Sequence, residues 1–455
     1  MPLPLIHTCQ DDESIRQSIK HSLSRLESGQ GGVGDRRFDT FESGQNFTEL
    51  VSHIIELVAQ QGDLGVVDCL KRIDKADVQA DSLVVTQDEL DRARAQVPAE
   101  LEAGLQLMAQ RIKAYAKEMM PKAQTWFEHE KGHKLGFRFT PIDNCGAYVP
   151  GGLGGSTPLI STVLMNLIPA KVAGVKNIVV ATPCGTDGSI NPCLLRACEI
   201  AGATTIYRAG GAQGVAAMAL GTQTCPPCSK IIGPGNAFVQ EAKRQLFGKI
   251  DIDMMAGPSE VAIIADEGAR PEVVAADLIA QAEHDPMASS FLFTTSSSLI
   301  EGVKASIEEQ LKVLPKADIA RESLAHYGAL CLCSSMDEAC TYSDLLAPEH
   351  LELSVAEPSE LLPKLQHAGA IFMGYQTAEV AGDYTAGPSH TLPTCGAARF
   401  TSGISVYSFL KSSSLLQYTR EAMASDLPAL AAMARAENLE GHARSAEIRF
   451  EDSRS

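Results

Sequence analysis

The sequence lacks the segments that direct a chain into or across a membrane. No apolar run approaches the roughly 20 residues that a spanning helix requires, and the N-terminus MPLPLIHTCQDDESIRQ has no basic stretch followed by an apolar one. Its early acidic residues also argue against an Arg-rich organellar presequence. These absences predict a cytoplasmic protein that does not associate with membranes.

Basic charge is scarce as well. Lys and Arg number 38 against 56 for Asp and Glu, which gives a formal charge of −18. Such a chain is repelled by nucleic acid phosphates and by anionic lipid headgroups. We therefore expect neither nucleic-acid binding nor attachment to a membrane surface.

Two common phosphate-binding motifs and a disulfide framework are also missing. No G-x-G-x-x-G follows an expected strand, and no G-x-x-x-x-G-K-[ST] occurs anywhere. The twelve cysteines are scattered through the chain, which suits reduced thiols in a cytosolic protein. The one close pair, Cys225 and Cys228 in TCPPCSK, has no second pair downstream. We interpret it as a surface turn ahead of a strand rather than as a redox or zinc site.

What is present is typical of a globular protein. The chain has 455 residues, of which 45% are apolar and 21% charged, enough for two to three domains. Residues 1–45 are polar and then glycine-rich (SGQGGVGDRR), which is typical of a loose arm or a partner-contacting extension. The next segment, to about residue 120, has apolar residues at helical spacing, with one helix ending at Gly62 and a break near Pro98.

After residue 142, short apolar runs alternate with helical segments. This alternation predicts an α/β fold of two doubly wound, incomplete Rossmann-like sheets, and sheets of this kind bind ligands at the carboxyl ends of their strands. The expected strands are 146–149, 177–181, 204–208, 230–232, 260–265, 290–293, 329–333, 351–354 and 370–373, with helices between most of them, including one at 360–365.

The same alternation gives the expected domain division. It consists of an arm over 1–45, a first α/β domain over 46–147 and 258–400, a second α/β domain over 148–257, and a helical tail over 401–455. The tail, with helices expected near 406–411 and 427–439, is too small to enclose a core. It must pack on another domain or another subunit.

Three glycine turns each follow an expected strand and precede an expected helix. They are VPGGLGGST (149–157), AGGAQG (209–214) and IIGPGN (231–236). Glycine lets a ligand approach the backbone, and the N-terminus of the following helix favours phosphate. One such turn is ordinary strand-to-helix chemistry, whereas three on one sheet edge favour a nucleotide or dinucleotide cleft.

Several polar pairs are candidates for chemistry. In DLIAQAEHDP, Gln281 and His284 would share one helical face, where they could hold a metal ion together, although most pairs of this kind are solvated surface. In LAPEHLEL, Glu349 and His350 precede a strand, where a carboxylate and an imidazole can serve as acid and base near neutral pH. The other sites are Ser259 in AGPSE, Asp383 and His390 in an expected long loop over 383–400, and Glu437 and His442 in ENLEGH.

Together these segments resemble histidinol dehydrogenase. The likeness runs from about Arg36 to Arg449, through VPGG, STVLMNLIPAKVAGV, GGAQGVAAMALGT, GPGNAFVQEAKRQ, IDMMAGPSE, DLIAQAEHDP, APEHLEL, GDYTAGPSHTLPT and EGHARSAEIR. The resemblance implies a zinc- and NAD-dependent enzyme that oxidises L-histidinol to L-histidine through L-histidinal, using two NAD⁺. It places the catalytic and zinc residues in the first α/β domain and NAD in the second.

The resemblance also implies residue roles. His350 would take the hydroxyl proton during the first oxidation, and Glu349 would activate the water that hydrates the aldehyde before the second. The implied zinc ligands are Gln281, His284, Asp383 and His442, the last donated by the partner subunit of a homodimer with crossed C-terminal tails. The four zinc ligands and His350 would also contact substrate, together with Ser259, His390 and Glu437, and the NAD contacts would be Tyr148, Gln213 and Asn236.

The sequence departs from the family pattern at three places and leaves two rivals. Residues 153–155 look inserted after PGG, Ser389 stands where Asn is usual, and residues 1–35 match loosely, so they receive no function. The nearer rival is a related zinc and NAD dehydrogenase of another small alcohol, such as a sulfonated diol. GPSE and GDY favour histidinol. The farther rival, a zinc hydrolase, would leave the three glycine turns unexplained.

Overall fold

The computed structural model describes residues 5–26, 46–129, 132–151, 158–315 and 317–451. Contacts within the chain define two compact units. The first comprises residues 1–119 and 143–409, and the second comprises residues 120–142 and 410–455. None of the helices in these described ranges is long and apolar enough to cross a membrane.

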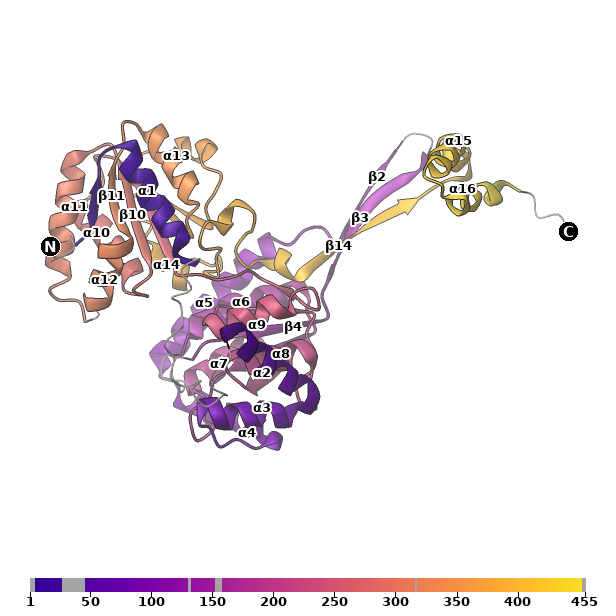
Figure 1. Ribbon diagram of the computed structural model, residues 1–455, viewed down its shortest axis with the longest axis horizontal. Helices are drawn as coiled ribbons and strands as arrows, with labels where there is room; N and C mark the ends of the chain where they lie inside the picture. Colours follow the sequence, from indigo (N-terminus) through magenta and orange to yellow (C-terminus); the bar gives the residue numbers. More distant parts are fainter. Residues whose placement is uncertain (1–4, 27–45, 130–131, 152–157, 316, 452–455) are drawn as a thin grey trace. The chain divides into compact units, whose positions relative to one another are not determined.

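The first unit contains a parallel sheet of six strands, and several of the candidate site residues lie at the ends of these strands. Its strand order is β1-β11-β10-β9-β12-β13. Figure 1 labels β10 and β11 of this sheet. The chain runs from β9 outward through β10 to β11 in one direction and to β12 and β13 in the other, so the winding direction changes between β9 and β12. The strands are β1 (His7–Cys9), β9 (Glu260–Ala265), β10 (Ser289–Thr294), β11 (Gly328–Leu332), β12 (His350–Ser354) and β13 (Ala370–Met373).

Both faces of this sheet are covered by helices. Val261 and Ile263 of β9 pack into one core, and Ala262 and Ile264 pack into the other, because successive strand residues point to opposite faces. Helices α10 (Pro271–Ala282), α11 (Ser297–Gln310) and α12 (Ala317–Tyr327) cover the first face, and α1 (Asp12–Leu23) and α13 (Met336–Leu346) cover the second. This confirms the doubly wound fold class.

The N-terminal segment differs from the loose arm expected from its composition. β1 pairs in parallel with β11, and α1 buries Ile15 and Ile19 against the sheet. The amphipathic spacing of these two isoleucines outweighs the polarity of the rest of α1. Residues 27–45, which include the glycine-rich stretch, lie outside the described residues.

The second parallel sheet of the first unit has five strands in the order β6-β5-β4-β7-β8. α6 packs against α7, and α8 packs against α9, as expected if right-handed connections place one pair on each face of the sheet. The elements are β4 (Asn144–Tyr148), β5 (Asn177–Thr182), β6 (Thr205–Arg208), β7 (Lys230–Ile232), β8 (Asp251–Ile252), α6 (Ile160–Ala173), α7 (Pro192–Ala201), α8 (Gly211–Leu220) and α9 (Ala237–Leu246).

The helices that precede β4 pack on this five-stranded layer. α2 (Phe47–Gln61) contacts α8 and α9, while α4 (Gln87–Gln96) contacts α7 and α5 (Ala99–Glu118) contacts α6. The expected domain division grouped residues 46–147 with residues 258–400. Helices α2, α4 and α5 instead pack against the helices of the five-stranded sheet. The expected stops are confirmed: Gly62 caps α2 with a φ of 60° and leads into α3 (Asp63–Cys69), and Pro98 separates α4 from α5.

Other local expectations needed correction. The helix expected at 360–365 is two short 3-10 turns, Pro358–Glu360 and Leu362–Lys364. The turn carrying Cys225 and Cys228 exposes Gln223 and Pro227, as expected of a surface turn, but it buries both cysteines, with 0% and 4% exposure, and Cys228 lies near Cys145. All twelve cysteines, each within the described part of the chain, are free thiols.

The second unit is a small antiparallel sheet with helices. Its strands, in the order β14-β3-β2, are β2 (Gln124–Glu128), β3 (Lys134–Pro141) and β14 (Leu410–Gln417), and α15 (Arg420–Ala436) and α16 (Glu440–Glu447) follow. The helix expected at 406–411 is wrong: a 3-10 turn, Val406–Phe409, leads into β14, whose pairing partner β3 lies some 270 residues earlier.

Candidate functional site

A polar cavity of about 250 Å³ lies at the amino-terminal ends of β9 and β12. Ligands are expected at the carboxyl ends of the strands, whereas the candidate residues of this sheet gather at the other edge. The cavity forms at the opposite edge because α10 runs antiparallel to β9 and returns its C-terminal end there. The predicted site residues that line it are Ser259, Gln281, His284, Glu349, His350, Asp383 and His390.

Glu349 precedes β12 and is 6% exposed. Its Oε2 accepts a hydrogen bond from the backbone N–H of Glu260 at 3.0 Å, and its carboxylate is also hydrogen-bonded to Ser259. Burial, followed by the nearby carboxylate of Glu260, raises the pKa of Glu349 well above its usual range. A carboxylate with a raised pKa is a stronger proton acceptor once it is ionised.

His350 is the first residue of β12 and is 5% exposed. Its Nδ1 lies 3.0 Å from the carbonyl oxygen of Glu260, which can only accept a hydrogen bond, so Nδ1 carries the proton. Burial lowers the pKa of His350 to about 4, which leaves the ring neutral at pH 7. Nε2 then carries the lone pair that can accept a proton.

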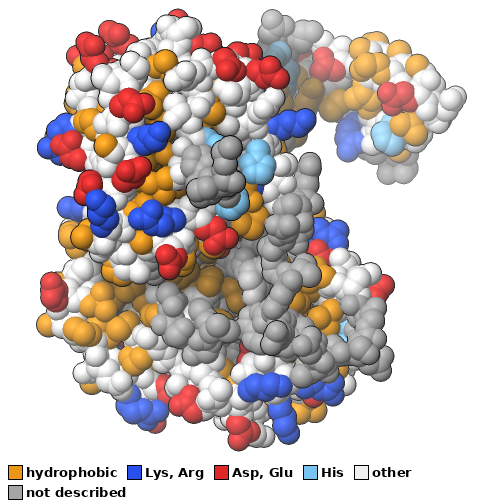
Figure 2. All heavy atoms as spheres, turned by 60° about the vertical axis from the view of Figure 1, so that its left-hand side comes forward, with side chains coloured by type: hydrophobic (Ala, Val, Ile, Leu, Met, Phe, Trp, Pro, Cys, Tyr) orange, Lys and Arg blue, Asp and Glu red, His pale blue; other side chains and the backbone are white. Residues whose placement is uncertain are grey.

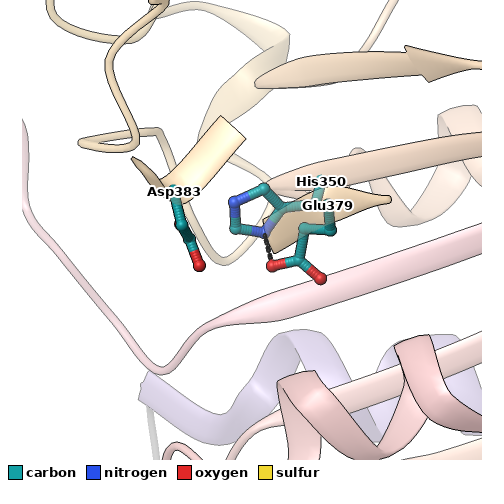
Figure 3. A group of neighbouring side chains, drawn as sticks. All are labelled: His350, Glu379 and Asp383. Atoms are coloured by element: carbon teal, nitrogen blue, oxygen red, sulfur yellow. Dashed lines mark ion pairs between the residues drawn. The ribbon is translucent and has the colours of Figure 1, made fainter. Parts of the chain in front are cut away.

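Glu379 is a cavity residue that sequence reasoning missed. It lies on α14 (Glu379–Tyr384), four residues before Asp383, so both carboxylates share one helical face. Figure 3 shows the imidazole of His350 between these two carboxylates, with Nδ1 3.3 Å from Glu379 Oε1. The spacing Glu-x-x-x-Asp was the available signal, and it was hidden by the expectation of a loop beginning at 383.

His390, by contrast, lies in the loop after α14. Its Nε2 is 3.1 Å from Thr162 Oγ1 on α6, and its Nδ1 is 3.1 Å from the carbonyl oxygen of Asp383. The neighbouring Thr391 donates its hydroxyl to Asn166 at 2.8 Å. The loop is therefore fastened to the five-stranded layer beside the cavity.

The donors in the cavity suit a divalent metal. Gln281 ends up 1% exposed on α10, and its Oε1 has no hydrogen-bond partner within the described residues. His284 follows in the turn after the helix, which ends at Ala282. The prediction that Gln281 and His284 share one helical face is therefore wrong, but both residues line the same cavity. One ligand atom each from His350, Glu379 and Asp383 also lie within 4.8 Å of one another. An amide oxygen buried without a partner is costly unless a cation or ligand satisfies it.

Not every predicted site residue is brought together. Glu437 caps the C-terminal end of α15, and His442 lies on α16. Both are exposed to solvent and belong to the second compact unit. In the view of Figure 2, acidic side chains are interspersed with basic ones, and histidine side chains gather on part of the surface shown.

A second cavity, of about 500 Å³, lies at the carboxyl ends of the five-stranded sheet, as expected there. It is next to the change of winding direction between β4 and β7. Tyr148, Gln213 and Asn236 all line it. Tyr148 accepts the N–H of Gly211 on its hydroxyl at 3.1 Å, Gln213 donates to Asp74 at 2.9 Å, and Asn236 caps α9 by accepting from the N–H of Val239 at 3.2 Å.

Two glycines at or near this cavity have positive φ values, which side-chain-bearing residues rarely adopt. α8 begins at Gly210 and Gly211 without a side-chain cap, and Gly211 has a φ of 57°. The N–H of Gly211 donates to Tyr148, and the N–H groups that follow it in the first turn point toward the helix N-terminus, where an anion is favoured. Gly233, with a φ of 108°, passes so close to Tyr148 that an added Cβ would lie 2.1 Å from its carbonyl oxygen. The expected insertion at 153–155 lies outside the described residues.

A doubly wound α/β protein with one cavity at glycine turns and another lined by buried acids, imidazoles and an amide has the features of an enzyme. Comparison with known proteins is more specific. The model of the histidinol dehydrogenase family matches residues 39–450. This chain belongs to the histidinol dehydrogenase family.

Individual relatives agree over nearly the whole chain. It is 48% identical to histidinol dehydrogenase 2 of a Nostoc species, over 88% of this chain and 92% of that one. It is 46% identical to the histidinol dehydrogenase of Geobacillus kaustophilus, over 94% of this chain and 99% of that one. The crystal structure of histidinol dehydrogenase from Elizabethkingia anophelis is 34% identical, with a TM-score of 0.90 and complete coverage of both chains.

Proposed function

We propose that this chain oxidises L-histidinol to L-histidine through L-histidinal, with one zinc ion per subunit and two NAD⁺ per turnover. Histidinol dehydrogenase activity, the last step of histidine biosynthesis, follows from membership of the family. The observation that carries the fuller proposal is the cavity that gathers Glu349 and His350 with the orphaned amide of Gln281.

Zinc is proposed to bind Gln281, His284 and Asp383 from this chain and His442 from the partner subunit of a homodimer. Nitrogen and oxygen ligands with open positions suit a zinc that also binds substrate. When bound, the metal would hold the substrate through its imidazole and amine. The exposure of Glu437 and His442 in a unit separate from the cavity residues supports their donation to a partner.

The two proton acceptors are proposed to act in sequence. His350, with Nδ1 committed to the carbonyl of Glu260, would accept the alcohol proton on Nε2 as hydride passes to the first NAD⁺. Glu349 would accept a proton from the water that adds to the aldehyde, and the second hydride transfer would follow. Ser259 and His390 would hold the substrate, with Glu437 supplied by the partner.

NAD is proposed to bind in the 500 Å³ cavity, with Tyr148, Gln213 and Asn236 as contacts. The uncapped start of α8 would receive the pyrophosphate. We also propose that the enzyme works in the cytoplasm, because its twelve cysteines are free thiols and the reducing cytosol keeps thiols in that state.

The test compares two substrates and two variants. Purified protein loaded with zinc and NAD⁺ should form NADH from L-histidinol and not from a sulfonated diol, the substrate type of the nearer rival. Gln281→Leu should lose zinc, measured by elemental analysis, while Gln310→Leu, on the neighbouring helix α11, should keep it. Turnover of the diol alone would assign the chain to the rival activity, and zinc retention by Gln281→Leu would remove this residue from the ligand set.

A further inference from the structure

Arg25 is a buried charge in a segment to which sequence reasoning gave no function. It lies in a 3-10 turn, Ser24–Leu26, directly after α1, and outside the 39–450 range of the family match. Its side chain is 0% exposed. Arginine is almost never fully buried unless its donors are paired, so this position requires a specific partner.

The guanidinium of Arg25 joins three parts of the first unit. Nη2 pairs with the Oε1 of Glu260 at the start of β9, and Nη1 donates to the carbonyl of Met287, in the turn between α10 and β10. Nε donates to the carbonyl of Ser22 at the end of its own helix, at 2.6 Å. The group also lies over the ring of Tyr327, 5.6 Å from its centroid.

Glu260 connects this arginine to both proton acceptors. Its carboxylate holds Arg25 and also accepts the backbone N–H of Cys395 at 3.1 Å. Its main chain contacts two residues that line the cavity: the N–H donates to Glu349, and the carbonyl accepts from Nδ1 of His350. Glu260 therefore orients the carboxylate of Glu349, sets the tautomer of His350 and holds the backbone at Cys395.

We propose that Arg25 is a positioning residue, which fixes the main chain of Glu260 and through it the orientation of Glu349 and His350. The inference rests on the proposed function, in which these two side chains accept protons. Removing the guanidinium leaves a carboxylate buried without its cation, and the start of β9 must then move or rearrange. Displacements of this kind at catalytic groups lower rates steeply.

The main test replaces Arg25 and adds its head group back. Arg25→Ala should lower kcat on the order of 10- to 100-fold while the KM for NAD⁺ and the zinc content stay unchanged. Millimolar guanidinium should restore part of kcat, because the cavity left by the side chain admits that ion. The matched control is Arg16→Ala, which removes an exposed arginine of α1 paired with Asp12 and should behave as the wild type.

Two further measurements keep the outcome decisive. If Arg25→Ala does not fold, Arg25→Lys and Glu260→Gln replace it, and both should lower kcat and shift its pH profile. The ring-nitrogen resonances of His350 in isotope-labelled protein should also change in these variants. A kcat equal to wild type, or a loss matched by the unfolded fraction with no guanidinium rescue, would overturn the proposal. If wild-type protein fails to oxidise histidinol, the proposed function fails, whereas the resonances still report on Arg25.

Discussion

Replacing Glu349 by glutamine should separate the two oxidations proposed for this cavity. The amide is the same shape as the carboxylate, and its oxygen can still accept the N–H of Glu260 that now lies 3.0 Å away. Only the capacity to accept a proton is lost. Loss of a general base costs about 10²- to 10⁴-fold in rate, equivalent to roughly 3 to 5 kcal/mol of barrier.

That loss should fall on one step. Single-turnover NADH formation should slow by this factor when L-histidinal is the substrate, and by less than about 10-fold for the first oxidation of L-histidinol. His350→Asn should slow both. Since burial raises the pKa of Glu349, the wild-type second step should gain rate as pH rises through that pKa, and Glu349→Gln should lack this limb. Equal losses in both steps for Glu349→Gln would refute the assignment of the water-activating role.

Three other expectations follow from the geometry. Gly211→Ala forces a side chain into a φ of 57° and should weaken NAD⁺ binding by about 10-fold in a fluorescence titration. His442→Ala should lose zinc while remaining folded, and mixing it with His350→Asn should restore part of the activity only if tails cross between subunits. Because burial and Asp277 raise the folded pKa of Glu352, its ionisation opposes folding above its unfolded pKa, so Glu352→Gln should raise Tm more at pH 8 than at pH 5.

Sequence reasoning succeeded where local pattern decides structure. After Glu260, the run VAIIA at 261–265 is apolar throughout because β9 is covered on both faces, and the strand expected at 260–265 is confirmed. The glycine turns at 209–214 and 231–236 pointed to residues that line the second cavity, because backbone conformation is encoded locally. The position of β14 was missed since its serines and leucines fit a helix or a strand, and pairing with β3 decides between them.

The residues of the site were likewise predictable only where a local pattern marks them. Glu349 and His350 could be chosen because they are adjacent and precede a strand. Glu379 could have been found from its spacing to Asp383, had α14 been expected. No local pattern distinguishes Arg25 from an exposed arginine, because its partner Glu260 lies 235 residues away.

The most direct test of the central claim is the number of NADH molecules formed for each L-histidinol consumed. Zinc-loaded protein should give two, with L-histidine as the product, and chelation of the metal should abolish both. A yield of one NADH with accumulated aldehyde would contradict the role given to Glu349 and its water. Absence of NADH from histidinol would contradict the account as a whole.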